Sequence, residues 1–191
     1  MGKPKNMCIG CKAPCCTLLV ELNTYDLNRI RAVVSDEEAN FAELMDAADD
    51  DLGFKANGRI LRFTMKRKPN GDCIFLNREG ELHCRVYGNK PSICTTYPFK
   101  EKDGKVIVKT TVGCQREAGW DVDDAFRANR KRGDEEWGRY FEIIDEWNAF
   151  AEGYEPHQDF AVFAFHRMED FKNPLWRLTR GLRLWIEKTF R

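Results

Sequence analysis

The stretch CIGCKAPCC at residues 8–16 places four cysteines within nine residues. A C-x2-C turn directs two thiolates to one side, which is why it recurs in zinc and iron–sulfur sites. Cysteines buried as small apolar side chains would explain one or two such positions, but not four so close together. We therefore expect cysteines to bind metal and organise the fold. The candidate ligands are Cys8, Cys11, Cys15, Cys16, Cys73, Cys84, Cys94 and Cys114.

Cys15 and Cys16 are adjacent, and neighbouring side chains of extended backbone point in opposite directions. We therefore expect either that one binds metal while the other packs, or that each serves a different centre. Eight thiolates can form two sites of four, each a tetrahedral zinc ion or a [4Fe–4S] cluster. One cluster with four surplus cysteines is the alternative. Two later pairs can each complete a site: Cys73 with Cys84, and Cys94 with Cys114.

The composition of the 191-residue chain is that of an ordinary globular protein, with 42% hydrophobic and 32% charged residues. Lys plus Arg (31) balances Asp plus Glu (31), so net charge gives no nucleic-acid signal. No apolar signal-peptide region follows Met1, and no apolar run approaches the roughly 18 residues of a transmembrane helix. We expect a cytoplasmic protein, in which thiols stay reduced and clustered cysteines indicate metal binding rather than disulfides.

Strand and helix patterns are predicted between the N-terminal cysteines and Cys73. Thr24 is the expected cap of a first helix, and Ser35 with Glu38 forms a capping-box pattern at the start of a second. The expected elements are a strand, two helices and another strand, at residues 17–22, 25–34, 36–48 and 59–66.

Residues 73–84 predict a β-hairpin, because apolar residues flank a stretch of turn-forming ones. Pairing Leu76 with Glu81 puts Cys73 directly opposite Cys84. The Cβ atoms of cross-strand neighbours lie about 4.5–5.5 Å apart, so both sulfurs can reach one metal.

A second hairpin is predicted at Asp103-Gly104, a dipeptide typical of two-residue turns. It brings the Cys94 segment back towards Cys114. Pro98 interrupts regular strand pairing there, because proline has no backbone N–H.

The remainder of the chain, from Trp120 onward, has a helical and aromatic pattern. Gly133 and the stretch 153–156 separate the helices that we expect at residues 121–131, 134–151, 159–171 and 174–190. The predicted fold class is α+β, with a small irregular β-hairpin domain organised by metal and a helical part after it. The predicted domains are a cysteine-cluster domain at 1–118 and a helical extension at 119–191, packed on the first.

The order of three motifs carries a family resemblance: CIGCKAPCC, then CIFL at 73–76, then CRVYGNKPSICTTYPF at 84–99. This order resembles the YkgJ-type cysteine-cluster family (CxxCxxCC type), also described as a zinc- or iron-chelating domain. The resemblance covers residues 8–99. Lys90 departs from the family pattern, which usually has Arg before the proline at 91, and lysine cannot replace a bidentate arginine contact.

The resemblance implies an iron–sulfur cluster, of the [4Fe–4S] type and one or two in number, or Zn²⁺. Related domains occur in flagellin lysine N-methylases, which use S-adenosylmethionine. The leading hypothesis is a metal-binding protein in electron transfer or iron handling, with a redox or other protein partner. The alternatives are a methyltransferase or oxidoreductase related to those methylases, and a zinc-stabilised interaction module. No dinucleotide-binding, P-loop or nucleophile-elbow motif is present, so no catalytic residue is assigned.

Overall fold

The computed structural model describes residues 14–47, 53–79, 84–108 and 123–168. Its central feature is a four-stranded antiparallel sheet built around one long strand, β4 (Arg59–Met65). Strand β2 (Ala42–Asp46) pairs along one edge of β4. Strands β3 (Phe54–Ala56) and β1 (Glu21–Leu22) pair with β4 along its other edge.

A tight turn sets the register of β3 against β4. Asn57 and Gly58 both have positive φ, 52° and 71°, as a type I′ two-residue hairpin requires. The Asn57 N–H also donates to the Glu155 carbonyl at 2.9 Å, which ties this hairpin to the loop before the last described helix. The Asn-Gly dipeptide is a strong hairpin signal that our sequence analysis missed.

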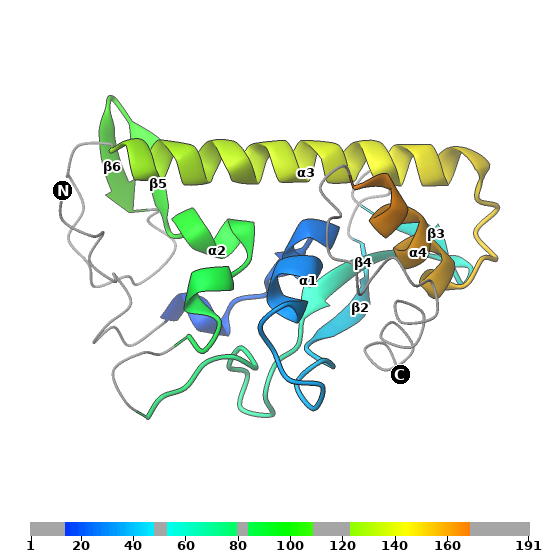
Figure 1. Ribbon diagram of the computed structural model, residues 1–191, viewed down its shortest axis with the longest axis horizontal. Coiled ribbons are helices and arrows are strands. Elements are labelled where there is room, and N and C mark those ends of the chain that lie inside the picture. The colour runs from blue at the N-terminus through cyan, green and yellow to red at the C-terminus, as the bar shows by residue number, and fades with distance from the viewer. Residues whose placement is uncertain (1–13, 48–52, 80–83, 109–122, 169–191) are drawn as a thin grey trace.

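Four α-helices and two 3₁₀ turns complete the described structure: η1 (Pro14–Thr17), α1 (Thr24–Arg31), η3 (Tyr87–Asn89), α2 (Ser92–Thr96), α3 (Asp124–Phe150) and α4 (His157–Arg167). Figure 1 shows α3 running the length of the molecule, with α2 beside its N-terminal half and α4 beside its C-terminal half. A second, two-stranded sheet joins β5 (Phe99–Lys102) to β6 (Lys105–Val108). No helix among the described residues is both long enough and apolar enough to span a bilayer.

One hydrophobic core joins the sheet to α1, α3 and α4. At its centre the rings of Phe54 and Phe160 stack with their centroids 3.8 Å apart, and both side chains are fully buried. Trp147 of α3 packs edge-on against Phe160, and its Nε1 donates to the Lys55 carbonyl at 2.8 Å. The helical half therefore shares its core with the sheet.

The α+β fold class is confirmed, as are the strand at 59–66 and the hairpin at Asp103-Gly104. Both turn residues of that hairpin have positive φ, which matches its expected type. The first expected helix forms as α1, but its cap is Asn23, whose side chain accepts from the Asp26 N–H at 2.8 Å. The strand expected at 17–22 is reduced to Glu21–Leu22.

The helix expected at 36–48 is wrong, because residues 42–46 form strand β2 instead. Ser35 and Glu38 do exchange the hydrogen bonds of a capping box, at 3.3 and 3.4 Å, but around a turn that no helix continues. The exposed edge of β4 offers Ala42–Asp46 backbone pairing and a buried place for Ala42. Tertiary pairing overrides local helix propensity here.

The break expected at Gly133 is also wrong, since α3 runs without interruption from Asp124 to Phe150. A glycine inside a helix costs only about 1 kcal/mol, which the packing of such a long helix can offset. Gly133 faces α2 at close range: a Cβ added there would lie 3.6 Å from the Ser92 Cβ. The helix expected at 174–190 lies outside the described residues.

Candidate metal centre

Five cysteines from four segments line a single cavity of about 400 Å³. They are free thiols, and each is partly buried. Cys15 and Cys16 lie in turn η1, and Cys94 lies in helix α2. Cys73 lies in the turn after β4, and Cys84 lies at an isolated backbone bridge. The other three predicted ligands, Cys8, Cys11 and Cys114, lie outside the described residues.

Apart from the cysteines, aliphatic and aromatic side chains line most of the cavity. Phe75 and Val86 are buried behind it, and Tyr87 and Tyr97 contribute their rings. Lys90 is the one charged residue among those described in the lining, and its ammonium lies 4.4 Å from the centre of the Tyr87 ring. A cation–π contact therefore occupies the position at which the resembled family usually has arginine.

The two adjacent cysteines do not diverge as expected. They lie in the 3₁₀ turn Pro14–Thr17 rather than in extended backbone, and both face the cavity. Their thiols share a hydrogen bond, which lowers the pKa of Cys15 to about 7 and raises that of Cys16. Both sulfurs are therefore available to one site.

The predicted register of Cys73 opposite Cys84 is wrong. Residues 73–76 form a turn, in which the Leu76 N–H donates to the Cys73 carbonyl at 2.9 Å. The backbone bridge joins Leu76 to Cys84, and Cys73 bridges Arg67 instead. The turn also buries Phe75 in the core. Both cysteines nevertheless line the same cavity.

Backbone contacts hold the turn against η1. The Cys73 N–H donates to the Cys16 carbonyl at 2.8 Å. Burial raises the pKa of the Cys73 thiol, and backbone hydrogen bonds from Phe75 and Leu76 oppose that rise. Backbone N–H donors of this kind stabilise a thiolate, the form in which cysteine binds metal.

The thiols also act on one another electrostatically. Burial raises the pKa of Cys94, and the charges of Cys73, Asp26 and Cys84 raise it further. Cys73 and Cys84 likewise raise the pKa of Cys16. Several desolvated thiols that repel one another's negative charge are stabilised when a metal cation replaces their protons. The donor chemistry of the cavity thus fits zinc or iron.

Among the described residues, no three His, Cys, Asp or Glu side chains converge closely enough to hold one metal ion. The cysteines instead surround open volume.

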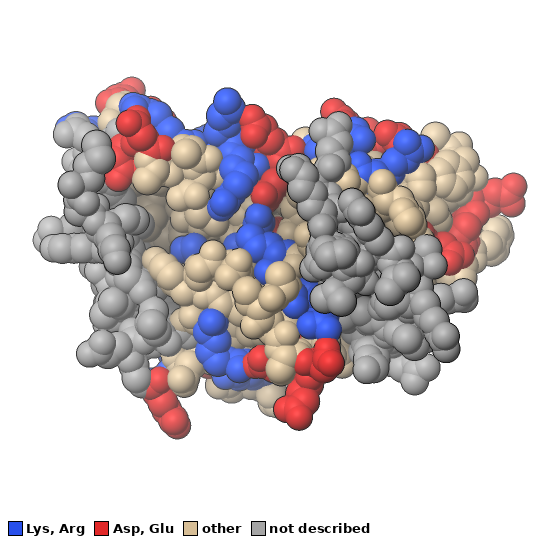
Figure 2. Space-filling view, viewed as in Figure 1, with Lys and Arg blue, Asp and Glu red and all other residues tan. Residues whose placement is uncertain are grey.

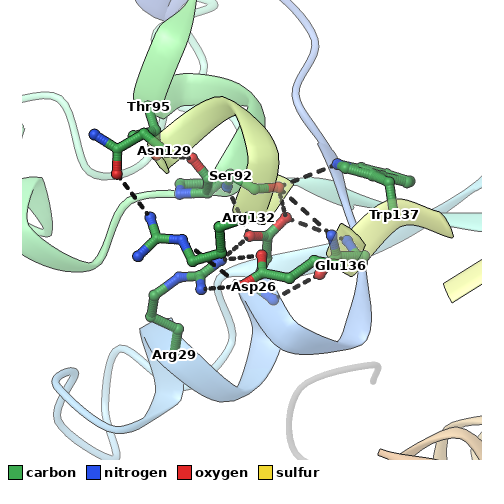
Figure 3. Close-up of polar contacts among 10 residues, drawn as sticks. Asp26, Arg29, Ser92, Thr95, Asn129, Arg132, Glu136 and Trp137 are labelled. Carbon is green, nitrogen blue, oxygen red and sulfur yellow. Dashed lines mark hydrogen bonds and ion pairs between the residues drawn. The ribbon is translucent and has the colours of Figure 1, made fainter. Parts of the chain in front are cut away.

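A buried polar network lies behind the Cys94 helix, and sequence analysis missed it. We call it the Asp26 network; Figure 3 shows its members Asp26, Arg29, Ser92, Glu136 and Trp137, contributed by α1, α2 and α3. Asp26 is fully buried, and its Oδ1 accepts from the Ser92 N–H at 2.7 Å and from Arg29 at 2.5 Å. Arg29 also forms a bidentate pair with Glu136, at 2.8 and 2.9 Å.

Burial raises the pKa of Asp26 to about 6, although the Arg29 guanidinium opposes the rise. In sequence, Asp26 appears only as a residue in the first turn of a helix, where acidic side chains are common. Nothing in that local pattern indicates burial or contact with a residue 66 positions later.

Comparison with known proteins gives one match. No curated protein and no solved structure matches the chain. A family model does match residues 7–115, more than half of the chain and the whole cysteine series. That family is CxxCxxCC, described as "Putative zinc- or iron-chelating domain". The cysteine-lined cavity lies within the matched region, and the chain belongs to the CxxCxxCC family.

Proposed function

We propose that the cysteine cavity holds an iron–sulfur cluster of the [4Fe–4S] type and that the protein works in electron transfer. The observation that carries the proposal is the arrangement of five cysteines around one largely apolar volume of about 400 Å³. The family supports chelation of zinc or iron in general. The shape of the cavity favours a cluster over a single ion.

A tetrahedral zinc site brings its four sulfurs within about 4 Å of one another, because each Zn–S bond is about 2.3 Å long. Such a site leaves no cavity between the ligands. A cluster fills the space itself, so its four cysteines stand further apart. Cysteines that line an open volume support the second arrangement.

The proposed ligands are Cys73, Cys84 and Cys94, with Cys16 or Cys15 as the fourth. The first three come from separate segments and interact electrostatically. The cysteines outside the described residues remain predicted ligands, for this site or for a second one.

The lining of the cavity supports electron transfer rather than substrate turnover. When bound, the cluster supplies one-electron chemistry. The described lining offers no carboxylate and no imidazole as a general acid or base. Its aromatic and aliphatic side chains exclude water, and such a shell tunes a reduction potential. The free thiols fit a reducing compartment, so we propose a cytoplasmic location.

Anaerobic purification tests the proposal directly. We expect brown protein with stoichiometric iron and sulfide, absorbance at about 400 nm, and a paramagnetic signal after reduction. Cys73→Ser should lose most of the iron. Thr95→Ser is the control, because its hydroxyl can still donate to the Pro91 carbonyl and position 95 does not line the cavity. Colourless protein carrying only zinc would overturn the proposal.

A further inference from the structure

Helix α2 is too short to hold Cys94 in place by itself. It spans only Ser92–Thr96. Helices of this length are unstable in isolation, because they form too few backbone hydrogen bonds to offset the unfavourable free energy of nucleation. Its N-cap, Pro91, offers no side-chain hydrogen bond. The orientation of the Cys94 thiol must therefore depend on contacts made by the ends of the helix.

The first residue of α2 makes those contacts. The Ser92 N–H donates to Asp26 Oδ1 at 2.7 Å, and the Ser92 hydroxyl lies 3.3 Å from Asp26 Oδ2. The same hydroxyl accepts from Trp137 Nε1 at 3.1 Å and from Asn23 Nδ2 at 3.5 Å. Ser92 is thus fixed from α1 and α3 at once, two residues before Cys94 (Figure 3).

Burial of the Asp26 carboxylate is unfavourable, since a buried carboxylate destabilises the folded state by several kcal/mol unless it is paired. Its partner is Arg29, which Glu136 also engages, and Arg132 approaches Glu136 at 3.9 Å. Apolar residues often replace a buried ion pair without loss of stability. The carboxylate offers what an apolar residue cannot, namely a fixed acceptor for the first N–H of α2.

We propose that Asp26 is a positioning residue for the metal ligand Cys94, because it fixes Ser92 and so holds α2 in the orientation that points the thiol into the cavity. The inference rests on the proposed metal site for its functional meaning. The hydrogen bonds to α2 themselves exist independently of which metal is bound.

Two substitutions of similar volume separate the hydrogen bond from the charge. Asp26→Leu removes both the charge and the acceptor, whereas Asp26→Asn removes the charge and keeps an oxygen that can accept from the Ser92 N–H. Glu136→Gln is the matched control, because it weakens the pairing of Arg29 without touching Ser92.

Two measurements on the full-length, anaerobically purified protein read out the effect. The first is amide hydrogen exchange of residues 92–96, which we expect to accelerate at least about tenfold in Asp26→Leu. The second is the rate of metal loss to a chelator, which should rise by about 10–100-fold if it follows the loss of metal affinity that removal of a ligand-orienting residue causes. Asp26→Asn should stay within a few-fold of wild type in both, and Glu136→Gln should match wild type.

Folded Asp26→Leu protein with wild-type exchange and wild-type metal loss would overturn the inference, as would Asp26→Asn that behaves like Asp26→Leu. If Asp26→Leu does not fold, Asp26→Ala takes its place. It also removes the acceptor for the Ser92 N–H, and wild-type behaviour in both measurements would again overturn the inference. Purified protein without iron would contradict the proposed function, while the exchange of residues 92–96 would still test Asp26.

Discussion

The aromatic side of the molecule and its cysteine side are built in opposite ways. We define the aromatic side as β3, β4, α4 and the C-terminal half of α3, and the cysteine side as residues 14–20, 73–79 and 84–97. The aromatic side closes on stacked, fully buried rings such as Phe54 and Phe160. The cysteine side surrounds a cavity of about 400 Å³ with partly buried thiols.

The two sides are stabilised by different interactions. Regular strands and long helices satisfy their own backbone groups, and buried rings contribute a large hydrophobic term. A 3₁₀ turn, a four-residue turn and a five-residue helix pair few of their own backbone groups, although the four-residue turn buries the ring of Phe75. The desolvated thiols even oppose one another. The aromatic side is therefore stable by packing, and we propose that metal completes the cysteine side.

The face shown in Figure 2 has no such division in the sign of its charges. Figure 2 shows basic and acidic side chains interspersed on the visible face, including the edge formed by α3. Several charged residues of α3 pair along the helix, as Arg139 does with Glu142 at 2.7 Å. The two sides differ in their interiors.

Removing a ring from the aromatic side should have the largest effect on global stability. Phe160→Ala deletes a fully buried ring that stacks on Phe54. We expect a loss of about 3–5 kcal/mol in the free energy of unfolding, measured by urea denaturation, because a cavity remains. Phe150→Ala is the control, since Phe150 is 57% exposed, and should cost about 1 kcal/mol or less. A loss that disappears when metal is chelated would contradict packing as the source.

Acidification should act at Asp26, which contacts the cysteine side through Ser92. Its pKa is about 6 in the folded protein and 3.8 when unperturbed, so the folded state binds more protons between these values. The associated stability is fully present below about pH 4 and is lost as the pH rises through about 6, by up to about 3 kcal/mol. Relative to Asp26→Asn, wild type should therefore gain stability from pH 7 to pH 4. Parallel melting curves of the two proteins across this range would refute the assignment.

Metal removal should affect the cysteine side alone. After chelation, amide exchange at residues 73–76 and 92–96 should accelerate at least about tenfold, which corresponds to about 1.4 kcal/mol of local stability. Residues 59–65 in β4 should keep their protection, because strands pair with them on both edges. Equal acceleration in both regions would show that the two sides fold as one cooperative unit.

The smallest effect concerns the two glycines of α3. Gly138→Ala should stabilise the protein by about 0.5–1 kcal/mol, because alanine favours helix and a Cβ there meets nothing within 4 Å. Gly133→Ala should give a similar gain in thermal unfolding, since its Cβ would make ordinary contact with Ser92 at 3.6 Å. Destabilisation or metal loss in Gly133→Ala alone would show that α2 tolerates no displacement.

Local chemistry made several parts of the fold predictable. Asp103-Gly104 demands positive φ at both positions, and that requirement produces the observed hairpin. The alternation in residues 59–66 predicted β4. The helix predicted at residues 36–48 is wrong, because a capping box and helix-forming residues carry no information about the free edge of a distant strand.

The sequence by itself determined the kind of chemistry: eight thiols, ordered as in one family of zinc- or iron-chelating domains. Spacing is a local property, so a single chain can display it. Only the tertiary structure decided that Cys15 and Cys16 face the same cavity as Cys94, and that a buried carboxylate supports the Cys94 helix. Such contacts depend on how segments more than 60 residues apart pack together, and no local pattern encodes that packing.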